Sequence, residues 1–360
     1  MSAVPGAREV REEDAFDVSA AAAWLRANAE DPTGLEEDPE VRQFSGGASN
    51  LTYLLRYPSG RDLILRRAPG GTKAKGAHDM RREFEIQSAL APVFPYVAPM
   101  VAFCDDPSVL GGDFYAMGRI DGVIPRSTWP ADVPLSPGQA RQLCLNVVEV
   151  YAELHSVDAE AAGLGHFGRG PGYVRRQVEG WSTRYRNAYT PDNPDFVEVM
   201  AWLDAHQPDD VATCVIHNDF KIDNLVLSPD DPTQVVGVLD WEMATLGDPL
   251  MDVGGALAFW VQADDSDELQ LTKRVPTDLP GMITREEFVQ AYCERMGFDM
   301  TPERWRFYEV FGLFRNAVIA QQIYYRYFHG QTTNEMFALF GPGVQILDRR
   351  IAELLKPDAP

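Results

Sequence analysis

The sequence of 360 residues is poor in cysteine and contains no long apolar run. Its four cysteines, at positions 104, 144, 214 and 293, lie far apart without a C-x-x-C spacing, which argues against a zinc site and a disulfide framework. No eighteen apolar residues follow one another, and the first 13 residues have no apolar core behind a basic stretch. We therefore expect a protein of the reducing cytoplasm, with neither a membrane span nor a secretion signal.

Positive charge is also scarce, because 32 Lys and Arg residues stand against 54 Asp and Glu residues, which gives a net charge of −22. The phosphates of nucleic acids or of an anionic membrane would be repelled over most of such a surface, so we expect neither as a partner. A cationic substrate stays open, although a solvated acidic surface is the simpler interpretation. The sequence makes no prediction of an oligomeric state.

The length and a hydrophobic content of 45% allow a large core, and we expect two lobes. Residues 1–38 are interpreted as an N-terminal arm with a short Ala-rich helix. The β-rich runs 51–57 and 62–67 flank a Pro-Ser-Gly turn, which predicts a hairpin. A helix is expected at 79–90. These elements predict a β-rich N-terminal lobe over residues 39–120.

The remainder, residues 121–360, is expected to form a larger and mostly helical lobe. Within residues 137–157, apolar side chains recur at spacings of three and four, as on the buried face of a helix. Two short apolar runs, 212–216 and 235–239, predict small strands that carry a loop between them. Residues 284–355 are expected to be mostly helical. The predicted class is therefore α+β.

The most informative segment is residues 217–224, which read HNDFKIDN and are followed sixteen positions after Asn224 by Asp240. The segment fits an H-x-D-x-x-x-x-N catalytic loop with a downstream metal-binding Asp. Phosphoryl transfer needs an acceptor for a hydroxyl proton and magnesium held against phosphates. Asp219 can accept the proton, while Asn224 and Asp240 offer oxygen ligands for the metal. Singly, these residues are common in loops, and His217 alone would more often be structural. Their combined spacing favours a catalytic role over a purely structural one.

This pattern resembles the aminoglycoside phosphotransferase and choline kinase superfamily, and the resemblance covers nearly the whole chain. Residues 215–224, 238–252 and 173–177, with Trp181, are most similar to the kinase-like domain that is fused to acyl-CoA dehydrogenases in some animals. One departure is Asn218, which stands where the superfamily usually has Gly. If this position needs a positive φ, Asn is the next most tolerant residue, so we expect the loop geometry to survive.

The resemblance implies a bilobal protein-kinase-like fold that uses ATP and Mg²⁺, with nucleotide bound by residues 39–120. It implies that Asp219 is the catalytic base and that Asn224 and Asp240 bind the metal. It assigns structural support of the catalytic loop to His217 and Asp252. Residues 121–360 would then carry the catalytic loop and the site of a small-molecule acceptor.

The resemblance also implies a nucleotide-binding site in the N-terminal lobe. Its nucleotide loop would contain Ser45, Gly46, Gly47, Ser49 and Asn50, although the kinase pattern G-x-G-x-x-G is absent. Arg66 stands where the superfamily carries a phosphate-binding Lys, and either side chain can neutralise phosphate oxygens. We favour Glu83 as its helix partner, with Glu85 as the rival. Met117 and Arg119 fall in the hinge whose backbone would pair with adenine.

The acceptor is left open, because this superfamily phosphorylates many small alcohols on one scaffold. Arg175 and Arg176 belong to a locally basic stretch, which is either an anion-binding wall or a solvated helix face, and Arg315 and Tyr325 are further candidates. We favour a neutral or anionic hydroxylated acceptor, such as a hydroxy acid or its acyl-CoA ester. An aminoglycoside is the alternative, and a catalytically weak nucleotide-binding pseudokinase is a third possibility. A protein kinase is disfavoured because D-F-G and A-P-E are absent.

Overall fold

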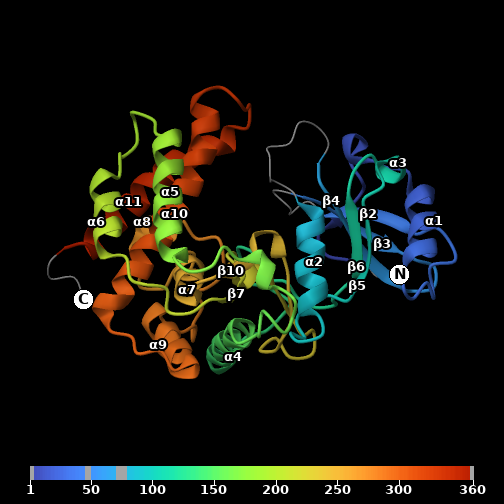
Figure 1. Ribbon diagram of the computed structural model, residues 1–360, viewed down its shortest axis with the longest axis horizontal. Helices are drawn as coiled ribbons and strands as arrows, with labels where there is room; N and C mark the ends of the chain where they lie inside the picture. Colours follow the sequence, from blue (N-terminus) through green and yellow to red (C-terminus); the bar gives the residue numbers. More distant parts are fainter. Residues whose placement is uncertain (1–3, 45–49, 70–78, 357–360) are drawn as a thin grey trace. The chain divides into compact units, whose positions relative to one another are not determined.

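The computed structural model describes residues 4–44, 50–69 and 79–356 (Figure 1). The chain divides into two compact units, and each is described here by itself. Unit 1 comprises Met1–Asp121 and Gly237–Glu242, and unit 2 comprises Gly122–Val236 and Met243–Pro360. The predicted nucleotide-loop residues Ser45, Gly46, Gly47 and Ser49 lie outside the described residues.

Unit 1 is built on a six-stranded antiparallel sheet in the order β1-β2-β3-β4-β6-β5. Its elements are β1 (Ala7–Arg8), α1 (Val18–Asn28), β2 (Glu40–Phe44), β3 (Leu51–Arg56), β4 (Asp62–Arg67), α2 (Met80–Leu90), β5 (Met100–Cys104), α3 (Pro107–Leu110) and β6 (Phe114–Gly118). The predicted hairpin is confirmed, since β3 pairs with β4 from Leu51↔Arg67 to Arg56↔Asp62. Its turn uses Gly60 at φ 92°, a conformation in which Gly carries no steric cost.

The two faces of this sheet are covered by different helices, because successive side chains along a strand point to opposite faces. Leu55 and Leu65 pack in one core cluster with Leu25 of α1, whereas Leu54 and Ile64 pack in a second cluster that contains residues of α2. Figure 1 shows α1 and α2 on opposite sides of the sheet. Residues 1–38 were expected to form an arm, but part of this segment is buried in the core of unit 1.

The short segment Gly237–Glu242 belongs to unit 1 although it lies far along the chain. The Trp241 side chain is fully buried with its ring edge against Phe94, at 6.0 Å between ring centres, and its Nε1 donates to the Val238 carbonyl over 2.9 Å. The Val238 amide in turn donates to the Tyr96 carbonyl over 2.7 Å. These contacts hold Asp240 against unit 1.

Unit 2 is mostly helical. Its elements are α4 (Pro137–His155), α5 (Tyr173–Ala188), α6 (Val197–His206), β7 (Cys214–Ile216), β8 (Leu225–Leu227), β9 (Val235–Val238, which runs on into unit 1), β10 (Thr245–Gly247), α7 (Pro249–Leu257), α8 (Asp267–Gln270), α9 (Arg285–Met296), α10 (Pro302–Phe328) and α11 (Phe340–Leu354). The strands form two small sheets, β10-β7 and β8-β9. Among the described residues, no helix combines the length and the apolar character needed to cross a membrane.

The helix starts of unit 2 follow local sequence signals. Ser136 and Gln139 form a capping box at the start of α4, and Thr284 and Glu287 form another at the start of α9. Farther along, α10 crosses α7 with almost no space between the backbones, because a Cβ added at Gly312 would lie 2.1 Å from the Gly254 carbonyl oxygen. The close contact between α7 and α10 therefore depends on glycine.

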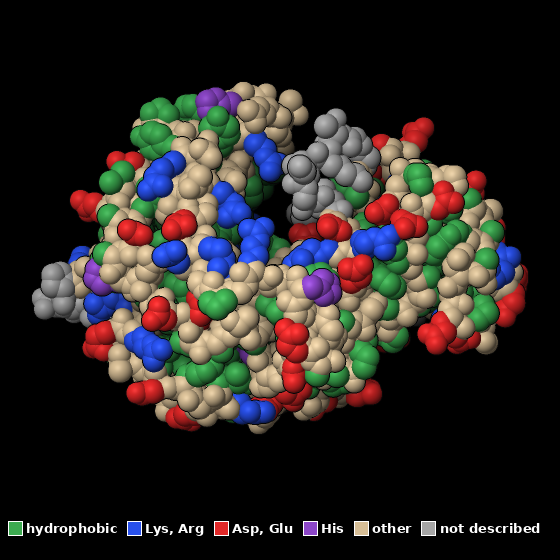
Figure 2. Space-filling model, viewed as in Figure 1, with side chains coloured by type: hydrophobic (Ala, Val, Ile, Leu, Met, Phe, Trp, Pro, Cys, Tyr) green, Lys and Arg blue, Asp and Glu red, His purple; other side chains and the backbone are tan. Residues whose placement is uncertain are grey.

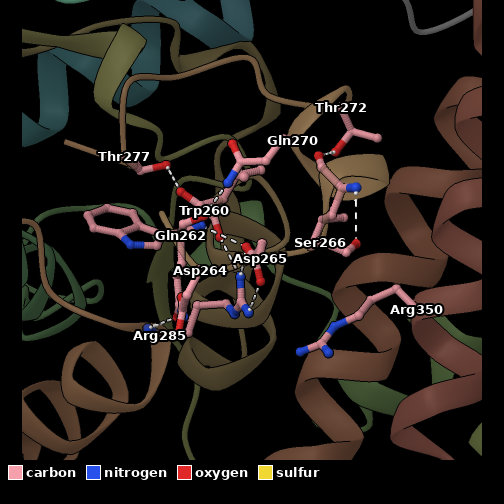
Figure 3. A network of polar contacts seen from close by, with 12 residues as sticks. Trp260, Gln262, Asp264, Asp265, Ser266, Gln270, Thr272, Thr277, Arg285 and Arg350 are labelled. Atoms are coloured by element: carbon pink, nitrogen blue, oxygen red, sulfur yellow. Dashed lines mark hydrogen bonds and ion pairs between the residues drawn. The ribbon is translucent and has the colours of Figure 1, made fainter.

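A polar network holds the loop between α7 and α9 (Figure 3). The guanidinium of Arg285 binds Asp265 through both terminal nitrogens, over 2.7 and 2.8 Å, and also donates to the Trp260 carbonyl over 2.9 Å. Gln262 accepts from the Arg285 backbone amide, and its own backbone amide donates to Asp265. In this loop, a buried positive charge is matched by a buried carboxylate.

Candidate functional site

The candidate catalytic loop, residues 217–224, connects β7 to β8 in unit 2. Within it, the carboxylate of Asp219 is held on both oxygens. The Asn224 side chain donates through Nδ2 to Asp219 Oδ2 over 2.9 Å, and the Lys221 ammonium lies 3.0 Å from Oδ1. The same Nδ2 donates to the Asp219 backbone carbonyl over 2.9 Å, and no hydrogen-bond partner of Asn224 Oδ1 is found among the described residues. The loop thus fixes the orientation of a partly exposed carboxylate.

Asn218 adopts the positive φ that was expected for this position, at 64°. Its side chain compensates for the conformational cost through two contacts, because Tyr173 donates from its hydroxyl to Asn218 Oδ1 over 3.2 Å and Nδ2 donates to the Met243 carbonyl over 3.1 Å. A glycine would make neither contact. The replacement of Gly by Asn therefore preserves the turn and adds attachments to it.

A buried carboxylate, that of Asp252, holds the start of the loop. Asp252 of α7 accepts from the backbone amides of His217 and Asn218, both over 2.7 Å. His155 contacts the same carboxylate through Nε2 at 3.2 Å and contacts the Tyr292 hydroxyl through Nδ1 at 2.6 Å. Burial alone would raise the pKa of Asp252, but the hydrogen bond and the charge of His155, with the His217 contacts, lower it. An ionised carboxylate therefore orients the residues that precede Asp219.

Two residues of this loop were not singled out from the sequence. Lys221 contacts Asp219 and also lies 4.9 Å from the ring centre of Phe259. Asp223 is partly buried, and its Oδ1 has no hydrogen-bond partner among the described residues. Burial raises the pKa of Asp223. The signal for Lys221 was its position two residues after Asp219, which places a cation beside the Asp219 carboxylate.

In unit 1, Arg66 of β4 joins two carboxylates. Its Nη1 lies 2.8 Å from Glu83 Oε1, and its Nη2 lies 3.3 Å from Asp240 Oδ1. Glu83 is 1% exposed, whereas Glu85 is exposed, so the structure pairs Arg66 with the favoured candidate. Burial alone would lower the pKa of Arg66, but the surrounding acidic groups raise it above its ordinary value. Arg66 therefore stays positively charged.

Asp240 has a backbone conformation that is rare for its residue type. Its φ is 68°, in the left-handed region, and such strained residues cluster at functional sites. Nearby, the buried Asn50 side chain donates to Glu242 over 3.2 Å and lies 3.5 Å from Glu83. Of the predicted nucleotide loop, the described residue Asn50 thus points toward the carboxylates of unit 1.

The first residue of the predicted hinge, Met117, lies in β6 and is held by strand pairing within unit 1. Met117 of β6 pairs with Ile64 and also with Met100. The Arg119 guanidinium lies 3.1 Å from Asp62 and 2.5 Å from Asp121. These two ion pairs hold the Arg119 side chain against Asp62 and Asp121.

The acceptor candidates lie in different surroundings. Arg175 is exposed and lies 3.8 Å from Glu179, and Arg176 donates to the carbonyl of Gly170 over 2.7 Å. The Tyr325 ring lies 4.2 Å from the His329 ring at a tilt of 52°, and no contact with the catalytic loop is found for it among the described residues. Figure 2 shows Lys and Arg side chains gathered on unit 2 near α5 and α10. Within the described part of the chain, Arg315 is the candidate that contacts the loop, since its Nη2 donates to the Asn218 carbonyl over 2.7 Å.

Comparisons with known proteins identify the family of the chain. The model of one family, described as the phosphotransferase enzyme family, matches residues 40–308. The chain is 35% identical over 92% of its length to acyl-CoA dehydrogenase family member 10 of Mus musculus, and 32% identical over 98% to family member 11 of Rattus norvegicus. It spans only 30% and 46% of the lengths of these two relatives.

Solved structures share the fold. A protein of Ralstonia eutropha, described as a candidate aminoglycoside phosphotransferase, is 31% identical, with a TM-score of 0.78 over 94% of this chain and 98% of the other. An aminoglycoside phosphotransferase solved as a ternary complex with AMP-PNP and hygromycin B is 17% identical, with a TM-score of 0.54 over 87% of this chain and 93% of the other. The predicted α+β, kinase-like fold class and the predicted resemblance are confirmed.

Proposed function

Because the chain belongs to the phosphotransferase enzyme family, we propose that it transfers the γ-phosphate of ATP to a hydroxyl group of a small molecule. The observation that carries this proposal is the Asp219 carboxylate, oriented by Asn224 and Lys221 in a loop that Asp252 braces. In phosphoryl transfer the protein contributes mainly by positioning and by electrostatic stabilisation, and this loop offers both.

Asp219 acts as the general base in this proposal. Its carboxylate accepts the proton of the acceptor hydroxyl while the hydroxyl oxygen forms a bond to the γ-phosphorus, and the bond from that phosphorus to the bridging oxygen breaks to release ADP. The Asn224 hydrogen bond on Oδ2 fixes the carboxylate for this transfer. Lys221 supplies positive charge beside Oδ1, where it can offset the charge on the phosphoryl group.

We propose Asn224 and Asp240 as the magnesium ligands. Among the described residues, no hydrogen-bond partner is found for Asn224 Oδ1, and the Asp240 carboxylate is partly exposed. Two oxygen ligands suit Mg²⁺, because this ion uses few protein ligands and completes its shell with phosphates and water. When bound, the ion would neutralise phosphate charge, as Arg66 also can.

For the acceptor we propose a hydroxy acid or its acyl-CoA ester. The similarity to proteins named as acyl-CoA dehydrogenase family members supports this class. An aminoglycoside is the second candidate, favoured by the description of the Ralstonia eutropha protein. The pseudokinase alternative is disfavoured because Asp219, Asn224 and Asp240 are all present. Nucleotide contacts by Met117 and Asn50, acceptor contacts by Arg175, Arg176 and Tyr325, and a cytoplasmic location stay predictions.

The Asp219→Asn variant tests the proposed base. It keeps the size and the Asn224 contact but removes the proton acceptor, so kcat and kcat/KM should fall together by about 10²–10⁴-fold. The Kd for Mg-ATP, measured by calorimetry, should barely change. Asp230→Asn, the same chemical change at an exposed position of unit 2, is the matched control and should keep wild-type turnover. An Asp219→Asn variant that binds Mg-ATP and retains wild-type kcat would remove Asp219 from this role.

A further inference from the structure

Arg315 of α10 is packed into unit 2 directly beside the catalytic loop. Only 6% of the residue is exposed, and its Nη2 donates to the backbone carbonyl of Asn218 over 2.7 Å. The guanidinium carbon lies 5.3 Å from the centre of the Trp181 ring on α5. A Cβ added at Gly255 of α7 would lie 2.9 Å from Nη1, so glycine provides the room for this nitrogen. Three helices and the loop therefore fix the guanidinium.

The charge of Arg315 is not matched by a carboxylate. Within the described residues, its polar contacts are the Asn218 carbonyl and the Met243 sulfur at 4.0 Å, and no carboxylate oxygen lies within 4.0 Å of it. Other buried arginines in the protein do have such partners, as Arg66 and Arg285 show. A buried and unpaired charge is unfavourable unless a ligand supplies the opposite charge. The surroundings of Arg315 thus suit an anion.

The position of Arg315 connects this anion to the reaction. The carbonyl that it contacts belongs to Asn218, the residue directly before the proposed base Asp219. Because these two residues are adjacent in the chain, an anion on the guanidinium would be bound beside the loop that carries the base. The planar guanidinium binds carboxylate or phosphate oxygens with two parallel hydrogen bonds.

We propose that Arg315 binds an anionic group, a carboxylate or a phosphate, of the acceptor molecule and thereby selects anionic over polycationic acceptors. The proposal rests on the proposed phosphotransferase function and narrows its acceptor. It disfavours the aminoglycoside alternative, because a buried cation beside the base repels ammonium groups. A hydroxy acid would offer its carboxylate to Arg315, and an acyl-CoA ester would offer a phosphate of its CoA part.

The test compares Arg315→Met with the wild type on matched acceptors: C3–C6 hydroxy acids, their neutral amides, their CoA esters, and kanamycin. The variant should raise the KM of the anionic acceptor about 10- to 100-fold, the size expected for loss of a hydrogen bond to a charged group. The KM of the neutral amide and that of ATP should stay within about twofold. Arg315→Lys, which keeps the charge but loses the planar fork, should fall between. Arg295→Met, at an exposed ion pair, is the control.

The outcomes separate the role of Arg315 from a purely structural one. An equal loss for acid and amide, carried by kcat, would show that Arg315 only positions the loop and would overturn the proposal. Phosphorylation of kanamycin in preference to every anionic acceptor would overturn it as well. Phosphoryl transfer to hydroxy acids would identify their carboxylate as the anion bound by Arg315. Phosphoryl transfer to CoA esters would identify a phosphate of the CoA part.

If no acceptor is phosphorylated, the proposed function fails, and the anion site is then tested alone. Inorganic phosphate should raise the Tm of the wild type, because a ligand that binds only the folded state stabilises it, and should raise the Tm of Arg315→Met by clearly less. Equal shifts would overturn the proposal. Should Arg315→Met not fold, the acceptor KM values and the phosphate-induced Tm shift are measured on Arg315→Lys.

Discussion

Arg285 and Arg315 are both buried in unit 2, but their guanidinium groups meet different partners. Arg285 is 9% exposed and binds the carboxylate of Asp265 through both terminal nitrogens, with the Trp260 carbonyl as a third contact. Arg315 is 6% exposed and has a backbone carbonyl, that of Asn218, in place of a carboxylate. Figure 3 shows the Arg285 guanidinium facing the Asp265 carboxylate.

This difference distinguishes a structural charge from one available to a ligand. A paired buried charge holds its segment in place, and its removal leaves the partner charge unsatisfied. An unpaired buried charge near a catalytic loop becomes favourable only when a bound ligand supplies the opposite charge. The comparison therefore predicts stability effects at some arginines and binding effects at others.

The largest effect on stability is expected for Arg285→Met. The change leaves Asp265 buried without its partner, so the free energy of unfolding should fall by about 3–5 kcal/mol. Denaturant titration measures it, with Arg349→Met as the matched control at an exposed ion pair with Glu268, where less than about 1 kcal/mol should be lost. If Arg285→Met instead weakened acceptor binding at unchanged stability, the structural assignment of the paired arginine would be wrong.

Asp240→Ala should reduce turnover next most strongly. Loss of a proposed magnesium ligand removes several kcal/mol of stabilisation of transferred charge, so kcat/KM should fall by roughly 10²–10³-fold. Since Arg66 also loses one of its two carboxylate partners, we expect higher Mg²⁺ to restore activity only in part. Steady-state rates over a magnesium series measure this. Wild-type turnover at low magnesium would exclude Asp240 as a ligand.

Arg66→Ala should have a smaller and more selective effect. It removes a positive charge proposed to contact phosphate, so the apparent KM for ATP should rise by about tenfold while the acceptor KM stays nearly constant. Arg315→Met is expected to show the opposite selectivity, which makes the two variants a pair. A rise confined to the acceptor KM in Arg66→Ala would show that the nucleotide assignment of β4 is wrong.

Features set by local sequence could be predicted. The hairpin of β3 and β4 followed from β-rich runs around a Pro-Ser-Gly turn, and α4 followed from its apolar spacing. Asn218 was expected to tolerate a positive φ if the catalytic loop needs one, and it has one. Glu83, which the resemblance favoured over Glu85, is the residue that pairs with Arg66. In each case the deciding interaction involves neighbours in the chain or a recurrent motif.

Features set by distant contacts could not be predicted. The packing of residues 1–38 on the sheet depends on side chains of several strands, and the assignment of Gly237–Glu242 to unit 1 depends on Trp241 meeting Phe94. Arg315 was a candidate from composition alone, because its partner carbonyl is 97 positions away. Whether a buried charge is paired becomes visible only once the fold brings such residues together.

The most direct test of phosphoryl transfer is to follow the γ-phosphate itself. The wild-type chain would be incubated with ATP labelled in its γ-phosphate, with and without Mg²⁺, over hydroxy acids, their CoA esters, aminoglycosides and choline, and the products would be identified by mass spectrometry. We predict that the label appears on the hydroxyl of an anionic acceptor only when Mg²⁺ is present. Label that stays in ATP, or is released only as inorganic phosphate with every acceptor while Mg-ATP is bound, would contradict the account.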